Sequence, residues 1–177
     1  IPANLLTTYS AFNCLFCSYK AKNKADTFEL SFDDIIKRLS AFNADTLKEV
    51  HIVGGAHPSY MLDYYIRLIA DIRSNFPYLH IRGFSAVELH HIFKISAVDY
   101  KEGLCLLKEA GLQSIPGGGA EIFNENIRKQ ICPDKVNADE WLKIHETAHA
   151  IGIWSNATML YGHIEQIEDR IDHLQRL

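Results

Sequence analysis

Short apolar runs alternate along the chain with segments that repeat apolar residues at helical spacing. Strands are predicted at residues 4–8, 49–53, 80–84, 113–115 and 153–160. Helices are predicted at residues 31–41, 59–74, 99–111, 137–152 and 164–177. From the second strand onward, a new strand starts about every thirty to forty residues, which is typical of consecutive βα units. Right-handed crossovers then build a parallel sheet, which either closes as a barrel or stays open as a doubly wound sheet.

Unusual residues follow the predicted strands. In both arrangements the carboxyl ends of parallel strands meet at one edge of the sheet, where ligands bind. The segments expected at this edge are residues 10–17, 54–57, 85–88, 117–121 and 156–163. We therefore expect the functional site there.

Composition narrows the class of protein. The 177 residues carry a formal net charge of −4, with a pI near 6.1, so no basic surface predicts a nucleic-acid partner. No apolar run approaches the ~20 residues that span a bilayer, and we expect a cytoplasmic protein without a membrane partner. We expect one domain over residues 1–177, truncated at both ends, because the chain starts at Ile1 and ends inside a helical pattern at Leu177.

The four cysteines do not form a disulfide framework in a chain of this length. Cys14 and Cys17 are spaced as C-x-x-C, which suits a zinc half-site, a redox pair or an iron–sulfur ligand pair. Zinc requires further ligands, and no second paired set is visible. A redox pair usually opens a helix, whereas the polar stretch 20–24 follows here. The residues alone leave these alternatives open.

The first loop resembles the cluster loop of radical S-adenosylmethionine (SAM) enzymes, C-x-x-x-C-x-aromatic-C. Cys14, Phe16 and Cys17 match the last three marked positions, and Ser10 stands at the first. The resemblance implies a [4Fe–4S] cluster held at positions 10, 14 and 17, with SAM on the open iron and Phe16 beside the cofactor. Ser10 departs from the pattern, which has a cysteine at this position. The departure matters because a hydroxyl is a harder and poorer iron–sulfur ligand than a thiolate.

Longer blocks resemble the aminofutalosine synthases, a family of radical SAM enzymes in menaquinone biosynthesis. They comprise residues 49–58, 115–123, 131–135 and 155–165. The resemblance implies a partial (βα) TIM-like barrel of the radical SAM type, with parallel strands and outer helices. It also implies that the 5′-deoxyadenosyl radical adds to 3-[(1-carboxyvinyl)oxy]benzoate to form aminofutalosine. A reductant such as flavodoxin or ferredoxin, and a second copy in a homodimer, are the expected protein partners.

Two alternatives remain beside this family. The sibling cyclic dehypoxanthine futalosine synthase would abstract hydrogen instead of adding the radical to an alkene. A cluster-deficient homologue would bind SAM or a partner without turnover, and Ser10 motivates this second reading.

The cofactor residues are assigned from strand ends. Gly54 and Gly55 let backbone amides approach a ligand closely, and the resemblance directs them to SAM. Glu121 follows three glycines and is expected to hold SAM hydroxyl or amino groups; the alternative is an acid at a helix N-terminus. Ser85 and Glu88 share a third strand end, either as cofactor contacts or as an ordinary capping pair.

Substrate residues are assigned in the same way. His57 is the candidate catalytic residue, with loop packing as its alternative. Arg82 is the cation of its strand and could face a substrate carboxylate or form an ordinary salt bridge. Asn156 is expected to point inward, and His163 to reach the pocket from the following loop.

Other reactive side chains are expected to be structural. Cys105 lies among leucines, and Cys132 precedes a proline. His145 and His149 are four residues apart on a predicted helix, without the glutamate of a metalloprotease motif. We interpret them as one helix face.

Overall fold

A computed structural model describes residues 10–18, 20–21 and 24–177. Its centre is a four-stranded sheet in the order β1–β2–β3–β4, and every neighbouring pair is parallel. The strands are β1 (Glu49–Ile52), β2 (His80–Gly83), β3 (Ser114–Ile115) and β4 (Trp154–Ser155). The predicted parallel α/β sheet is confirmed, whereas the strand predicted at 4–8 lies outside the described residues.

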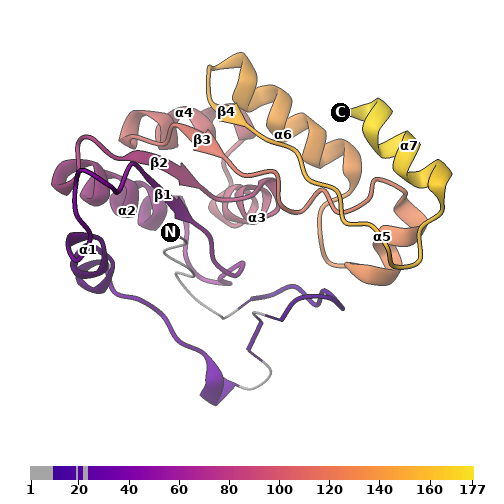
Figure 1. Ribbon diagram of the computed structural model, residues 1–177, viewed down its shortest axis with the longest axis horizontal. Coiled ribbons are helices and arrows are strands. Elements are labelled where there is room, and N and C mark those ends of the chain that lie inside the picture. Colours follow the sequence, from indigo (N-terminus) through magenta and orange to yellow (C-terminus); the bar gives the residue numbers. More distant parts are fainter. Residues whose placement is uncertain (1–9, 19, 22–23) are drawn as a thin grey trace.

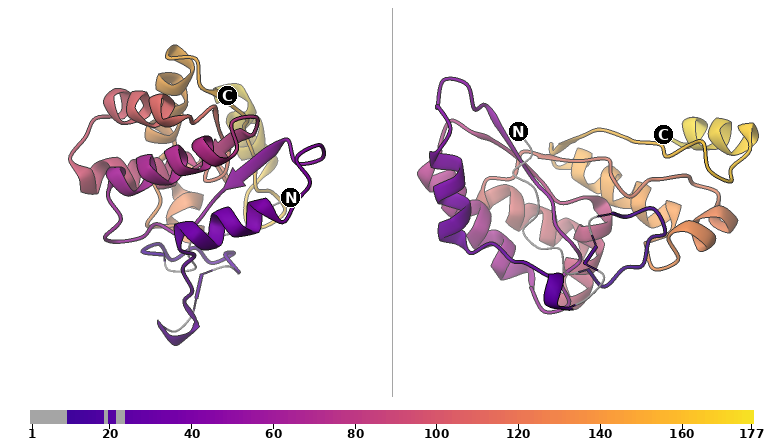
Figure 2. Two further views of the ribbon diagram at one scale, coloured as in Figure 1. Left: turned by 90° about the vertical axis from the view of Figure 1, so that its left-hand side faces the viewer. Right: turned by 60° about the horizontal axis from the view of Figure 1, so that its bottom comes forward.

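Helices lie between successive strands along the chain, except that the first helices precede β1 and the last follows β4, and several of them cover one face of the sheet (Figures 1 and 2). They are a 3₁₀ turn (Lys24–Asp26), α1 (Phe32–Ser40), α2 (Leu62–Asn75), α3 (Ala86–Ser96), α4 (Tyr100–Ala110), α5 (Glu125–Ile131), α6 (Ala138–Ala150) and α7 (Ile167–Arg176). Within the described ranges, none of them is long and apolar enough to cross a membrane.

The two faces of the sheet differ because side chains alternate along a strand. Val50, Ile52 and Ile81 are almost completely buried under the helices and belong to the main hydrophobic core. His51 and Arg82 point to the opposite face and line a cavity. The helix-covered face therefore stabilises the fold, and the other face is left for polar chemistry.

The sequence missed two helices and overextended one strand. Helix α3 begins at a capping box formed by Ser85 and Glu88, which the sequence had offered only as an alternative to cofactor contacts. Helix α5 begins at Asn124, whose side chain accepts hydrogen bonds from the first turn. The strand predicted at 153–160 pairs only at Trp154–Ser155, since the backbone beyond it bonds to the loop after β3 instead of to a strand.

Helix α7 is preceded by a turn that closes on one carboxylate. Glu165 accepts hydrogen bonds from the amides of Gly162 (2.6 Å) and His163 (2.9 Å) and from Arg170 Nε (2.8 Å). These donors favour the charged form, and together they lower the pKa of Glu165 from its ordinary 4.5 to about 2. The carboxylate thus ties the turn to the helix.

We expect this carboxylate to make folding sensitive to acid. A depressed folded-state pKa contributes stability that is present above 4.5 and is lost as the pH falls towards 2. Glu165→Gln should therefore lower stability at neutral pH and flatten the fall between these two values. Urea unfolding midpoints measured across this range test the prediction, with the exposed Glu168 changed to Gln as control. An unchanged acid profile in Glu165→Gln would contradict it.

Candidate cofactor site at the carboxyl edge of the sheet

A cavity of about 630 Å³ opens at the carboxyl edge of the sheet. It is bounded by the loop of residues 10–18, by the ends of all four strands and by Lys135. All but two of the predicted site residues line it, namely Ser10, Cys14, Phe16, Cys17, Gly54, Gly55, Arg82, Ser85, Glu88, Glu121 and Asn156. Segments far apart in the sequence therefore meet at one site, where strand ends of a parallel sheet are expected to place ligand-binding groups.

The cysteine-bearing loop of residues 10–18 is fastened to the segment that follows α5. The amide of Leu15 donates to the carbonyl of Ile131 (2.9 Å), and the amide of Asn13 donates to Oδ2 of Asp134 (2.8 Å). Figure 1 shows this loop passing beyond the strand ends towards α5. The amide of Ala11 also donates to the carbonyl of Ala56 (3.0 Å). Because the loop forms no helix or strand of its own, these bonds hold it over the cavity.

Lys135 is a site residue that the sequence did not single out. Its ammonium group pairs with the carboxylate of Glu121 and lies 5.1 Å from the ring centroid of Phe16. Burial opposes its charge, but Glu121 and Cys14 raise its pKa. For the Cys14 thiol, burial raises the pKa, and the positive charge of Lys135 lowers it. A cation thus stands beside the first thiol and partly offsets the effect of burial, which still leaves the pKa of Cys14 raised.

Glu88 organises the wall of the cavity at β1 and β2. Its carboxylate accepts from the amides of Gly54 (2.9 Å) and Ser85 (2.8 Å) and from Oγ of Ser85 (2.6 Å). Burial raises the pKa of Glu88, and these donors act against that rise. Ser85 and Glu88 therefore form the capping pair that the sequence offered as one alternative. Both residues also line the cavity. The sequence predicted that the amide of Gly54 binds a ligand, but in the structure this amide donates to Glu88.

Arg82 and Asn156 meet on the inner face of the sheet. Arg82 NH2 donates to Oδ1 of Asn156 (2.8 Å), and the amide of Gly117 approaches the same oxygen (3.3 Å). Glu49 lies 3.6 Å from Arg82 NH1 on the neighbouring strand. Both alternatives for Arg82 thus keep a structural basis, since it has a salt-bridge partner and faces the cavity.

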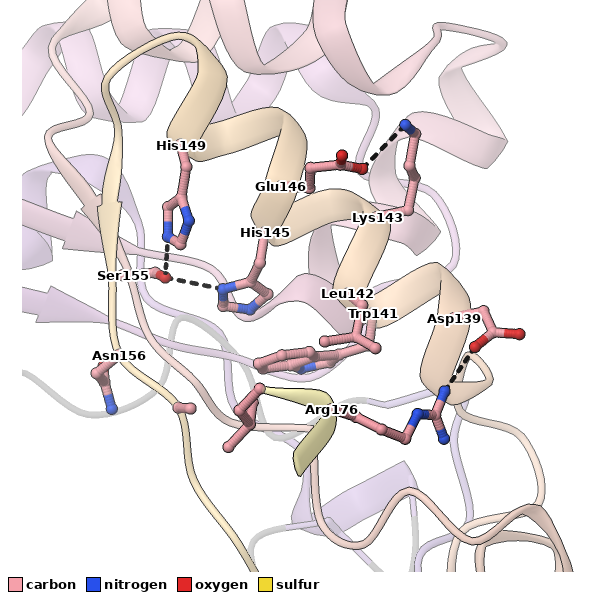
Figure 3. A pocket seen from close by; sticks show the side chains of 12 residues that line it. Asp139, Trp141, Leu142, Lys143, His145, Glu146, His149, Ser155, Asn156 and Arg176 are labelled. Carbon is pink, nitrogen blue, oxygen red and sulfur yellow. Dashed lines mark hydrogen bonds and ion pairs between the residues drawn. The ribbon is translucent and has the colours of Figure 1, made fainter. Parts of the chain in front are cut away.

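A histidine pair holds β4 in place. Nδ1 of His145 and Nε2 of His149 lie 2.9 Å and 2.7 Å from Oγ of Ser155. Figure 3 shows both rings reaching from α6 to Ser155, with Asn156 next along the chain. His145 also stacks on Trp141 with centroids 3.7 Å apart. His145 and His149 thus lie on one face of α6, as predicted, and they hold β4, which directly precedes Asn156.

His57 and His163 are not among the residues that line the cavity, and each contacts a carboxylate outside it, so the roles expected for them from the sequence stay predictions. Nε2 of His57 is 2.9 Å from a carboxylate oxygen of Glu29, and its ring stacks on Tyr60 at 3.7 Å. Nδ1 of His163 is 3.3 Å from Glu165, in the turn before α7. Local ionic and stacking partners hold these rings in place.

The donor set decides how well an iron–sulfur cluster fits. Cys14 and Cys17 carry free thiols and face the cavity, and the third position offers the hydroxyl of Ser10. In the part of the chain that the structure describes, no three His, Cys, Asp or Glu side chains are grouped to hold a metal ion. The loop fits a cluster at two thiolate positions and departs from it at Ser10.

Fold and site together define an α/β protein with a cysteine loop over the mouth of a parallel sheet. The family model described as the radical SAM superfamily matches residues 5–177. The chain therefore belongs to the radical SAM superfamily of enzymes, whose members use a [4Fe–4S] cluster and SAM.

Solved structures agree with this fold. Methylornithine synthase (PylB) superimposes with a TM-score of 0.77 over 97% of this chain and 47% of that one, at 17% identity. The hydrogenase maturase HydG gives a TM-score of 0.72 over 97% of this chain and 37% of that one, at 16% identity. The predicted partial TIM-like barrel of the radical SAM type is confirmed.

The curated relatives of this chain include two different enzymes. Aminodeoxyfutalosine synthase of Thermus thermophilus is 42% identical over 165 residues, which cover 93% of this chain and 44% of that protein. The 5-amino-6-(D-ribitylamino)uracil–L-tyrosine 4-hydroxyphenyl transferase of Methanopyrus kandleri is 38% identical over 165 residues, 93% of this chain and 45% of that protein. The chain thus spans less than half the length of these relatives.

Proposed function

We propose that this chain forms the cofactor-binding part of an aminofutalosine synthase. The complete enzyme would cleave SAM to methionine and a 5′-deoxyadenosyl radical. That radical would add to 3-[(1-carboxyvinyl)oxy]benzoate, and rearrangement with loss of carbon dioxide would give aminofutalosine. The convergence of Cys14, Cys17 and the strand-end glycines on one cavity is the observation that carries the proposal. The 42% identity to an aminodeoxyfutalosine synthase supports this member of the superfamily over others.

In this proposal Cys14 and Cys17, with Ser10 at the third position, would hold a cluster, which when bound would supply the electron for SAM cleavage. Lys135 keeps positive charge beside Cys14, and Glu88 fixes the backbone at Gly54. Asp134 holds the cysteine loop over the strand ends by accepting from Asn13. These residues would therefore bind and orient the cofactors at the carboxyl edge of the sheet.

The reductant and the location follow from the proposed chemistry. A reduced flavodoxin or ferredoxin would deliver the electron, and such carriers work in the cytoplasm. The exposed side chain of Cys17 places one side of the proposed cluster towards the surface, where a carrier can approach.

Product analysis tests the proposal most directly. The complete protein, reconstituted anaerobically with iron and sulfide, is supplied with SAM, dithionite and 3-[(1-carboxyvinyl)oxy]benzoate. We expect aminofutalosine by mass spectrometry, and none with Cys14→Ala. A second reaction contains tyrosine and 5-amino-6-(D-ribitylamino)uracil, the two compounds in the name of the other relative. A product from that pair alone would reassign the substrate.

Two further outcomes would reject the proposal. A third reaction contains dehypoxanthine futalosine in place of the benzoate substrate, and formation of its cyclic product there alone would indicate the sibling cyclase. Stoichiometric zinc, with no iron–sulfur absorbance after reconstitution, would indicate a zinc or dithiol protein built on Cys14 and Cys17.

A further inference from the structure

Two buried nitrogen atoms on the inner face of the sheet have no hydrogen-bond partner. Nε2 of His51 and Nε of Arg82 are sealed from solvent and bond to nothing in residues 10–18, 20–21 and 24–177. Both side chains line the cavity at the carboxyl edge. A buried polar atom without a partner is costly. His145 and His173 also carry such a nitrogen, but only His51 and Arg82 line this cavity, so a ligand group bound there could supply their missing partner.

The strands place these two atoms side by side. His51 on β1 and Arg82 on β2 are register partners in the parallel ladder. Because directly paired residues on the same face of a sheet lie about 5 Å apart, one small ligand group can reach both side chains. The geometry does not depend on a loop, since both residues lie within strands.

The charge around the pair selects an anion of low charge. Arg82 is a permanent cation, and burial together with Arg82 lowers the pKa of His51, which keeps its ring neutral. Glu49 already lies 3.6 Å from one arm of the guanidinium, and Asn156 accepts from the other. What remains is Nε of Arg82 and Nε2 of His51, which is a donor in one of the two tautomers of the neutral ring. Two donors suit the two oxygens of a carboxylate. A phosphate dianion would need more hydrogen-bond donors, and the negative charge of Glu49 would repel it more strongly.

We propose that His51 and Arg82 together bind a carboxylate of the small-molecule substrate. The inference rests on the proposed function, because the cavity also holds the cofactor loop. His51 lies three residues before Gly54, which is about 10 Å along a strand. A carboxylate bound at this depth leaves room above it, so the rest of the substrate extends towards the cysteine loop. The sequence had already assigned Arg82 to a substrate carboxylate, and His51 is the residue that the structure adds beside it.

Binding of a simple aromatic acid tests the inference without turnover. Calorimetry on the complete, cluster-loaded protein with SAM uses benzoate as the probe, and benzamide and inorganic phosphate as its comparisons. We expect Arg82→Gln to raise the benzoate Kd by on the order of 10-fold or more, the usual scale for a charge-assisted hydrogen bond. His51→Phe, which keeps a flat ring without a donor, should raise it by roughly 5-fold. Benzamide and SAM affinities should stay unchanged.

Controls separate binding from folding. Arg67→Gln removes an arginine that packs over Phe32, outside the cavity, and should leave the benzoate Kd unchanged. If Arg82→Gln fails to fold by circular dichroism, Arg82→Lys keeps the charge without the planar fork and should weaken benzoate binding by a smaller factor. Equal affinity for benzoate and benzamide, or competition by phosphate as strong as by benzoate, would overturn the inference.

The outcome also separates this inference from the proposed function. Benzoate binding that depends on Arg82, in a protein that makes no aminofutalosine, would uphold the carboxylate site and reject the function. Aminofutalosine formation with an unchanged substrate KM in His51→Phe and Arg82→Gln would uphold the function and reject the site.

Discussion

Ser10→Cys is expected to raise the iron bound after anaerobic reconstitution to about four per chain, the content of one [4Fe–4S] cluster. The cavity is lined by the thiols of Cys14 and Cys17, and position 10 contributes only a hydroxyl. A third soft ligand completes the set that iron–sulfur clusters require, whereas a serine oxygen binds iron poorly beside sulfide. We expect SAM cleavage to rise with the iron content, by on the order of 10-fold or more.

Iron and sulfide analysis, the absorbance of the cluster and 5′-deoxyadenosine formation measure this effect. Ser18→Cys is the matched control, because Ser18 lines the same cavity but stands outside the three-position motif. It should change none of these quantities, and Cys14→Ser should lower all of them. An equal gain in Ser18→Cys would show that any added thiol suffices, and no gain in Ser10→Cys would mean that position 10 is not a ligand.

Patterns with a strict local cause could be predicted from the sequence. Helix α4 begins after Asp99 and ends before Gly111, because the side chain of Asp99 accepts the amide of Glu102 and the glycine adopts a positive φ of 123°. The strand-end position of the site followed from the parallel sheet. The prediction made β4 too long because residues 156–160 continue an apolar pattern. In the structure these residues bond to atoms of a loop and not to a strand.

Lys135 and His51 show what the sequence left out. Lys135 reaches Glu121 from fourteen residues away, through a turn whose shape depends on the burial of Cys132 and Ile131. His51 resembles an ordinary polar residue on a short strand, and only its register with Arg82 brings two unpartnered nitrogens together. Both depend on contacts between segments, which no local pattern of residues encodes.

The three glycines after β3 have unequal roles, and the first of them is a packing requirement. A Cβ on Gly117 would lie 2.2 Å from the carbonyl oxygen of Asn156 and 2.7 Å from Cα of Ala157. Both contacts are to backbone, which cannot rotate away. Thr158 also donates through Oγ1 to the Gly117 carbonyl at 2.6 Å. The segment after β4 is therefore pressed directly against this glycine.

Gly117→Ala should consequently destabilise the protein by about 3 kcal/mol, the upper range for overpacking a tight contact. Moving Asn156 away would also release Arg82 and weaken substrate binding, since Asn156 accepts from its guanidinium. Urea unfolding measures the first effect and the substrate KM the second. Gly118→Ala is the matched control: its nearest neighbour would be Cβ of Ser85 at 3.9 Å, an ordinary contact, so its stability should stay within about 1 kcal/mol of the parent protein. Equal stability of the two variants would contradict the packing argument and, with it, the placement of Asn156 beside Arg82.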